Sequence, residues 1–163
     1  MLFSERVATL NWLRRELPQR LSLPDDAFAV LHGGLPDEKQ MAVVETFQRA
    51  TTPLRVLITG DVASEGVNLH KQCHHLVHVD IPWSLIRIEQ RNGRIDRYRQ
   101  LYPPRIVALA LTTTDEKFSG DVRVLTRLLA KEHAAHTALG DAASLLRLHD
   151  VGREEDEIRR TLA

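Results

Sequence analysis

The sequence has little cysteine and no long apolar run, and each shortage narrows the classes of protein it can encode. Cys73 is the only cysteine, so no internal disulfide can form, which is typical of a chain made in a reducing compartment. No segment approaches the roughly 18 consecutive apolar residues that predict a membrane-spanning helix. The first residues also lack the basic and then apolar pattern of a secretory signal. We therefore expect a cytoplasmic protein that does not enter a membrane.

Net charge is also absent, since 22 basic side chains balance 22 acidic ones. This balance argues against a domain that binds nucleic acid by charge alone. Lysine is scarce among the basic residues, with four lysines against 18 arginines. A guanidinium binds carboxylates and phosphates through a planar fork, whereas lysine is a point charge. Five arginines lie within residues 87–99, in the stretch RIEQRNGRIDRYRQ, which is either a solvated helix face or a docking site for an anion.

Strand and helix signals alternate through the first 112 residues, which predicts an α/β fold. Apolar residues at helical spacing predict helices over residues 5–20, from Pro36 onward and from Leu85 onward, with Ser84 as the cap of the last. Short apolar runs predict strands at residues 1–4, 28–31, 55–59, 76–80 and 105–111. Such runs are typical of a parallel sheet with helices on both faces. The chain of 163 residues, 43% hydrophobic, is long enough for one domain with a sizeable core.

The strand signals stop after Asp115. Val122, Leu125 and Leu129 predict a helix that ends near Gly140, and the charged tail GREEDEIRR predicts a further solvated helix. We expect residues 113–163 to form a helical extension packed on the domain of residues 1–112.

Polar or glycine-containing segments follow three of the predicted strands: HGGL, TGDVASEG and DIPWS. In open parallel sheets, ligands bind at the carboxyl ends of the strands, where these segments lie. On an ideal helix after Ser84, Gln90, Arg94 and Arg97 fall within roughly 60° of one another. Such a face is typical of a solvated surface as well as of a site, and the neighbouring segments favour a site. Of the tryptophans, Trp12 is expected in the core and Trp83 is expected to brace this helix.

Histidines and the cysteine crowd a short window but do not predict a metal site. On a strand His74 and His78 share one face and His75 points the other way, and the spacing matches no zinc pattern. His133 and His136 lie in EHAAH, which is not the H-E-x-x-H pattern of a metalloprotease. We expect no bound metal at either place.

Four segments, in order, resemble the second RecA-like lobe of superfamily-two helicases and translocases. LFSERVATLNWL and LHGGLPDEKQMAVVETFQ are similar to the first strand–helix unit and the His-Gly loop of that lobe. GDVASEGVNL looks like motif V, and EQRNGRIDRYRQ looks like motif VI. Motif VI ends as in the Swi/Snf-like branch, with Gln90, Arg94, Arg97 and Gln100, although Arg99 stands where glycine is common. The resemblance covers roughly residues 1–112 and implies a RecA-like fold.

The resemblance also implies a role in ATP hydrolysis. In this family ATP and Mg²⁺ are held between two RecA-like lobes, and the second lobe supplies arginine fingers. A finger stabilises the negative charge on the transferred phosphoryl group, by on the order of 10³–10⁵ in rate. By resemblance Arg94 and Arg97 are the fingers, while Gln90, Gly66 and Asn68 face the nucleotide.

Contacts with a nucleic-acid backbone are implied for two further loops. Main-chain N–H groups can bind phosphate without many basic side chains, which reconciles such contacts with a neutral chain. The Swi/Snf-like ending favours double-stranded DNA as the nucleic acid. The residues implied are His32, Gly33, Thr59, Gly60 and Asp61.

A phosphate cradle of the G-x-x-x-x-G-K-[ST] kind is missing, because no glycine in the chain is followed by lysine. Asp37-Glu38 and Asp115-Glu116 each precede a lysine, but both lie where a predicted helix begins, a position that favours carboxylates. We therefore predict the second lobe of an ATP-dependent motor, partnered by an N-terminal lobe of the same full-length protein and unable to hydrolyse ATP alone. The alternative is a non-catalytic module of the same fold that binds a partner protein or nucleic acid.

Overall fold

The computed structural model describes residues 1–61, 69–111 and 120–139, with the backbone alone for residues 131–139. The chain divides into two compact units. The first consists of Met1–Asp80 with Arg91–Ala108, and the second of Ile81–Gln90 with the chain from Leu109 onward.

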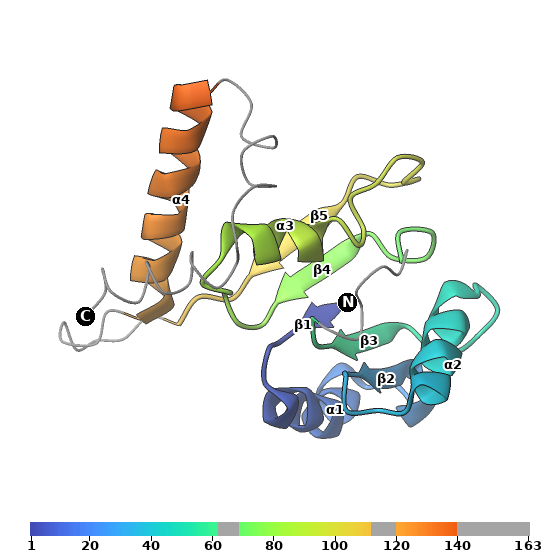
Figure 1. The fold of residues 1–163 in the computed structure, drawn as a ribbon. Coiled ribbons are helices and arrows are strands. Elements are labelled where there is room, and N and C mark those ends of the chain that lie inside the picture. The colour runs from blue at the N-terminus through green and yellow to red at the C-terminus, as the bar shows by residue number, and fades with distance from the viewer. Residues whose placement is uncertain (62–68, 112–119, 140–163) are drawn as a thin grey trace. The chain divides into compact units, whose positions relative to one another are not determined.

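A five-stranded parallel sheet forms the centre of the first unit (Figure 1). Its strands lie in the order β2-β3-β1-β4-β5, so the shortest strand, β1, is in the middle. There Leu2 is in register with Ile58 on one side and with Val77 on the other. The sheet confirms the predicted parallel α/β fold. Its strands are β1 (Leu2–Phe3), β2 (Phe28–Leu31), β3 (Val56–Thr59), β4 (His75–His78) and β5 (Arg105–Ala108).

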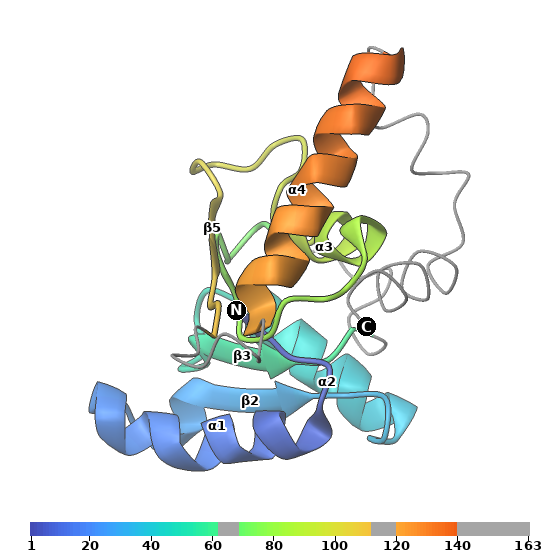
Figure 2. The ribbon, with the colours of Figure 1, turned by 90° about the vertical axis from the view of Figure 1, so that its left-hand side faces the viewer.

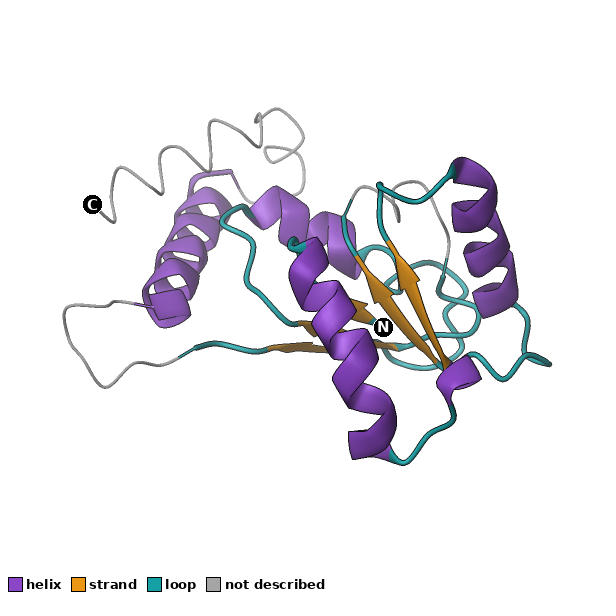
Figure 3. Cartoon of the chain, turned by 90° about the horizontal axis from the view of Figure 1, so that it is seen from below, coloured by secondary structure: helices purple, strands orange, loops and turns teal. Residues whose placement is uncertain are grey.

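Alternate strand side chains enter two apolar clusters, one on each face of β2 and β3, because successive side chains of a strand point to opposite faces. Helix α1 (Val7–Leu21) covers one face, where Leu10 and Leu13 pack with Ile58. Helix α2 (Asp37–Gln48) covers the other, where Phe47 packs with Leu57. Figure 2 shows α1 running along β2, and Figure 3 has helices on both sides of β2 and β3.

One prediction about burial is wrong. Trp12, expected in the core, is 49% exposed, because α1 turns Leu10 and Leu13 to the sheet and Trp12 lies about 200° from Leu10 around the helix. All four side chains of the edge strand β5 are exposed.

Helix α3 (Leu85–Asn92) is shorter than predicted. Ser84 caps it as expected, since its hydroxyl accepts a hydrogen bond from the Arg87 amide at 3.4 Å. The helix ends before Gly93, a residue that disfavours a helix interior. The amides of Arg94 and Ile95 then donate to the carbonyls of Arg91 and Asn92 in a turn. The interpretation of Gln90, Arg94 and Arg97 as one helical face is therefore wrong.

The second unit contains helix α4 (Gly120–Leu139), which confirms the predicted helix but not its buried face. Val124 and Leu128 are buried, whereas Val122 and Leu129 are 46% and 54% exposed. The buried pair packs with Ile81, and the half-buried Trp83 lies against the same cluster together with Leu85 and Ile88 of α3. Among the described helices, none is long and apolar enough to cross a membrane.

Candidate functional site

The loops at the carboxyl ends of β1, β2 and β3 lie side by side, which the sequence predicts for the segments after β2 and β3. The Gly60 amide donates to the Leu31 carbonyl at 2.9 Å, which joins the loop after β3 to the end of β2. A β-carbon added to Gly60 would lie 3.7 Å from the Ser4 carbonyl oxygen and 3.9 Å from Cβ of His32. The structure therefore brings His32 and Gly60 together at one edge of the sheet.

The His-Gly loop forms a tight turn. The main-chain amide of Gly34 donates to Nδ1 of His32 at 3.1 Å, and the Leu35 amide donates to the His32 carbonyl at 3.0 Å. A β-carbon on Gly34 would lie 3.1 Å from the His32 ring, a separation tighter than ordinary contact. Glycine at position 34 thus allows the ring to fold over the turn, while Gly33 is exposed at its tip.

The residues Thr59, Gly60 and Asp61 differ in accessibility. Thr59 is fully buried, its hydroxyl donates to the Gly60 carbonyl at 3.0 Å, and its own carbonyl accepts from the Ser4 amide at 3.1 Å. Gly60 and Asp61 are half-buried. Thr59 therefore holds the loop from inside, and Gly60 and Asp61 are the members of the trio that reach the surface.

A single arginine, Arg91, is the centre of the polar contacts at this edge, and its side chain is only 2% exposed. Its Nε and Nη2 donate to the two carboxylate oxygens of Asp61 at 2.6 and 3.0 Å. Its Nη1 donates to the carbonyl and to Oδ1 of Asp80 at 3.2 and 3.3 Å. Glu5 lies 3.8 Å from Nη2, and the guanidinium carbon lies 5.4 Å from the centre of the Phe3 ring. We call Arg91 with Glu5, Asp61 and Asp80 the Arg91 network.

The network joins the ends of three strands to the last turn of α3. Oδ2 of Asp80 accepts from the Ser4 hydroxyl at 2.5 Å and from the Glu5 amide at 2.9 Å, which links β4 to β1. Burial by itself lowers the pKa of Arg91, but Asp61 and its fellow carboxylates outweigh burial, and the net shift is upward. Arg91 is therefore a fixed cation, and breaking such a buried pair on one side leaves an uncompensated charge.

The buried His78 lies next to Arg91 on the interior side of the network, and its imidazole is neutral. Burial, followed by the charge of Arg91, lowers the pKa of His78, while its contact with Asn92 opposes the shift. Nη1 of Arg91 lies 3.5 Å from Nδ1 of His78 and can only donate, so Nδ1 is the acceptor. The proton is then on Nε2, which donates to Oδ1 of Asn92 at 2.9 Å.

The two predicted fingers lie beyond α3 and in different environments. Arg94 is 8% exposed, and its carbonyl accepts from the Leu69 amide at 3.3 Å. Arg97 is exposed, with Nε donating to the Gly93 carbonyl at 2.6 Å. Ile95 between them is fully buried in the core of the sheet. The backbone of this finger segment, residues 93–97, is thus anchored while Arg97 reaches solvent.

Of the other three predicted nucleotide-facing residues, the structure describes Gln90. Gly66 and Asn68 lie outside the described residues, although Leu69, which follows them directly, contacts the finger segment. Gln90 is exposed on α3 and belongs to the second unit.

Gln100 and Arg99 complete the stretch. The Gln100 amide group donates to the carbonyls of Cys73 and Ile95, both at 2.9 Å, which ties the segment to the loop before β4. Arg99 has φ of 71°, in the left-handed region that favours glycine. Arg99 therefore adopts a conformation that glycine would adopt without strain.

Sequence reasoning missed the role of Arg91. The available signal was charge: Glu5 and Asp61 lie just after predicted strands and Asp80 ends another, and the carboxyl ends of those strands meet at one edge of the sheet. Three carboxylates at one edge require a cation, and Arg91 is the arginine that the helix after β4 delivers there.

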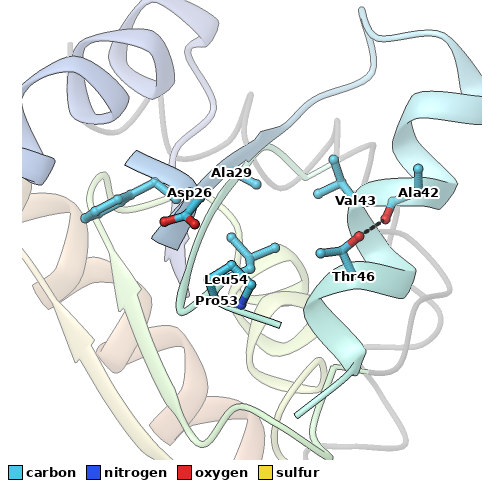
Figure 4. A pocket seen from close by; sticks show the side chains of 8 residues that line it. Asp26, Ala29, Ala42, Val43, Thr46, Pro53 and Leu54 are labelled. Atoms are coloured by element: carbon cyan, nitrogen blue, oxygen red, sulfur yellow. Dashed lines mark hydrogen bonds between the residues drawn. The ribbon is translucent and has the colours of Figure 1, made fainter. Parts of the chain in front are cut away.

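A pocket of about 240 Å³ lies away from this edge, between α2 and the starts of β2 and β3 (Figure 4). Its lining is mainly apolar and contains none of the predicted site residues; it consists of Asp26, Phe28, Ala29, Ala42, Val43, Thr46, Pro53 and Leu54. In the described part of the chain, no group of three His, Cys, Asp or Glu side chains is arranged to hold a metal ion.

Comparison with known proteins gives a consistent result. The family described as helicase conserved C-terminal domain matches residues 1–99. An uncharacterized ATP-dependent helicase, YqhH of Bacillus subtilis (strain 168), is 31% identical over 164 aligned positions, covering 99% of this chain and 27% of that protein. The RNA polymerase-associated protein RapA of Serratia proteamaculans (strain 568) is 32% identical over 92 residues, covering 56% of this chain and 9% of that protein. The crystal structure of the C-terminal part of the Fun30 ATPase domain superposes with a TM-score of 0.63 at 17% identity, over 99% of this chain and 46% of that one.

Proposed function

The chain belongs to the family of helicase conserved C-terminal domains, and from this premise we propose that it is the second motor lobe of an ATP-dependent helicase or translocase. The likeness to the Fun30 domain confirms the predicted RecA-like fold. The chain spans about a quarter of the length of the B. subtilis relative, so the activity of the whole protein is part of the proposal. In the proposal, an N-terminal lobe of the same protein holds ATP and Mg²⁺ and completes the site.

The nucleotide side of the proposal assigns the finger role to Arg94 and Arg97. The observation that carries it is the finger segment, in which the buried Ile95 anchors a turn from which Arg97 projects into solvent. A finger must be preorganised on its own lobe and still reach charge that develops on another. Gln90, Gly66 and Asn68 are proposed to face the same nucleotide.

The nucleic-acid side of the proposal uses the loops at the carboxyl edge. Gly33, Gly60 and Asp61 are accessible, His32 is half-buried, and the buried Thr59 supports them from inside. Main-chain amides of such loops bind phosphate without sequence preference, and Gly60, whose own amide donates to the Leu31 carbonyl, is proposed to allow close approach of the backbone. We propose that these contacts are made to the backbone of a duplex, with double-stranded DNA as the substrate.

The fingers are tested in the protein that carries both lobes. We expect Arg97→Ala to lower nucleic-acid-stimulated ATP hydrolysis about 10³-fold while largely sparing ATP binding, because charge on the transferred phosphoryl group loses its partner. The measurements are phosphate release and equilibrium binding of a fluorescent ATP analogue, each with duplex DNA and duplex RNA. Arg49→Ala is the matched control, since Arg49 is also exposed and pairs with Glu45 one helical turn away.

Arg94→Ala is expected to lower hydrolysis to the same extent and also to destabilise the fold, by about 1–3 kcal/mol, because Arg94 is buried. Its activity is therefore compared at a temperature where urea unfolding shows the variant fully folded.

Near-normal hydrolysis in Arg97→Ala would overturn the assignment of Arg97 as a finger.

A further inference from the structure

Arg91 lies between the two halves of the proposed site. On one side its fork holds both carboxylate oxygens of Asp61, the last residue of the Thr59–Asp61 loop. On the other side it lies in the last turn of α3, three residues before Arg94. Its side chain contacts residues at the ends of β1, β3 and β4 together.

The bidentate pairing with Asp61 makes a movement of Asp61 move the guanidinium of Arg91. Two parallel N–H···O bonds fix both the distance and the angle between a guanidinium and a carboxylate. The guanidinium has little freedom to rotate independently of Asp61, because Nη1 donates to Asp80 and the group lies over the Phe3 ring. Asp61 is 22% exposed, so it can be contacted from outside while Arg91 holds it from inside.

The backbone of Arg91 continues this connection into the finger segment. Its carbonyl accepts from the Arg94 amide at 3.1 Å, and the next carbonyl, of Asn92, accepts from Ile95 at 3.0 Å and Asp96 at 2.9 Å. A shift of the Arg91 side chain therefore acts on the same short turn that carries the fingers.

We infer that Arg91 is a positioning residue that couples the Thr59–Asp61 loop to the finger segment, so that contact of nucleic acid with the loop sets the placement of Arg94 and Arg97. The inference rests on the proposed function for the roles of loop and fingers. Arg91 itself touches neither nucleotide nor nucleic acid, since it is 2% exposed.

The connection is tested first in the 163-residue chain, without any activity. Asp61→Asn removes the charge that holds the guanidinium of Arg91. We expect the substitution to accelerate hydrogen exchange at the amides of Arg94, Ile95 and Asp96, relative to wild type, by a factor at least about tenfold larger than at the amides of β3. The β3 amides report opening of the whole sheet, so a purely structural loss would accelerate both groups equally. Asp25→Asn is the matched control, because Asp25 pairs with Arg14 at 3.0 Å away from this edge. Equal acceleration of both groups would overturn the inference.

The second test uses the protein with both lobes. Arg91→Lys keeps the charge but replaces the fork by a point charge. We expect the ratio of nucleic-acid-stimulated to unstimulated hydrolysis to fall about tenfold. Arg97→Ala, in contrast, should lower both rates together. Arg14→Lys is the control, since Arg14 also contacts an aspartate, a main-chain carbonyl and a phenylalanine ring.

An unchanged stimulation ratio in Arg91→Lys would overturn the coupling. Failure of the proposed function has a different signature, because the wild-type two-lobed protein would then show no hydrolysis that nucleic acid stimulates. The exchange result in the 163-residue chain does not depend on that outcome.

Discussion

At the scale of single residues, the arginines of residues 87–99 divide by burial and not by charge. Arg91 and Arg94 are 2% and 8% exposed, whereas Arg97 and Arg99 are exposed. Arg91 is neutralised by carboxylates of its own chain, so it adds nothing to a basic surface. The dense run of arginines in this neutral protein therefore contains two kinds of residue. Arg91 makes internal structural contacts, and Arg97 is an exposed side chain at the candidate site.

His78 gives the first prediction at this scale, on the pH dependence of stability. Its pKa is lowered in the folded state, so the unfolded chain binds the extra proton first. The contribution of His78 to the free energy of unfolding is then fully present above the ordinary histidine pKa of about 6.5. It is lost as pH falls from there through the lower pKa of the folded state. The loss is at most about 1.4 kcal/mol per pH unit over that interval. The groups that face the ring are Arg91, Asp61, Asp80 and Asn92.

The measurement is urea unfolding of wild type and His78→Gln between pH 7.5 and 5. Glutamine does not titrate, and its amide can donate to Asn92 and accept from Arg91, so the network is kept. We expect a shallower fall of the free energy of unfolding with acid in the variant. The carboxylates contribute equally to both curves, and identical slopes would contradict a neutral His78.

At the scale of elements, α3 has only eight residues, and a helix of that length is not stable in isolation. Its start is fixed by the cap at Ser84, whose side chain is fully buried. We expect Ser84→Ala to lower the free energy of unfolding by about 1 kcal/mol, as is typical of a lost N-cap. The measurement is thermal or urea unfolding followed by circular dichroism.

Ser84→Gly is the matched variant for this prediction. Glycine removes the same hydroxyl, but at an N-cap it costs only a few tenths of a kcal/mol, because glycine readily adopts the non-helical backbone of a cap. If Ser84→Gly proves as destabilising as Ser84→Ala or more so, the role of Ser84 is packing and not capping.

Most elements could be predicted because their signals are local. Five apolar runs became five parallel strands, and Pro36 precedes α2 with Asp37 and Glu38 in its first turn, where carboxylates are favourable. The end of α3 could not be predicted by winding an ideal helix, because Gly93 and the burial of Ile95 end it before Arg94. The exposure of β5 likewise depends on what lies beside an edge strand, which apolar content does not reveal.

Part of the candidate site could be predicted from the sequence and part could not. The meeting of His32 and Gly60 follows from the parallel order of strands, which the alternation of elements predicts. The pairing of Arg91 with Asp61 joins residues 30 apart in sequence, and it depends on the length and direction of α3. No local pattern carries that information.

At the scale of the whole molecule, the chain is a member of its family that spans 27% of the length of one relative and 9% of another. Family membership and fold describe what the lobe is built from, but hydrolysis also needs groups that hold the triphosphate. Within these 163 residues no glycine precedes a lysine, so the G-K-[ST] end of a phosphate cradle is missing. In our proposal, the exposed Arg97 acts on a triphosphate that another lobe holds.

The last prediction follows from the absence of this sequence pattern. We expect the purified 163-residue chain to release no phosphate from ATP, with or without duplex DNA, because a finger stabilises transferred charge but does not bind Mg²⁺-ATP by itself. Steady-state phosphate release is measured beside an identically prepared Arg97→Ala chain, which reports contaminating ATPases. Residual hydrolysis that is equal in the two preparations is contamination and agrees with the prediction. Hydrolysis by the wild-type chain that Arg97→Ala abolishes would show a self-sufficient ATPase and would refute a role confined to the second lobe.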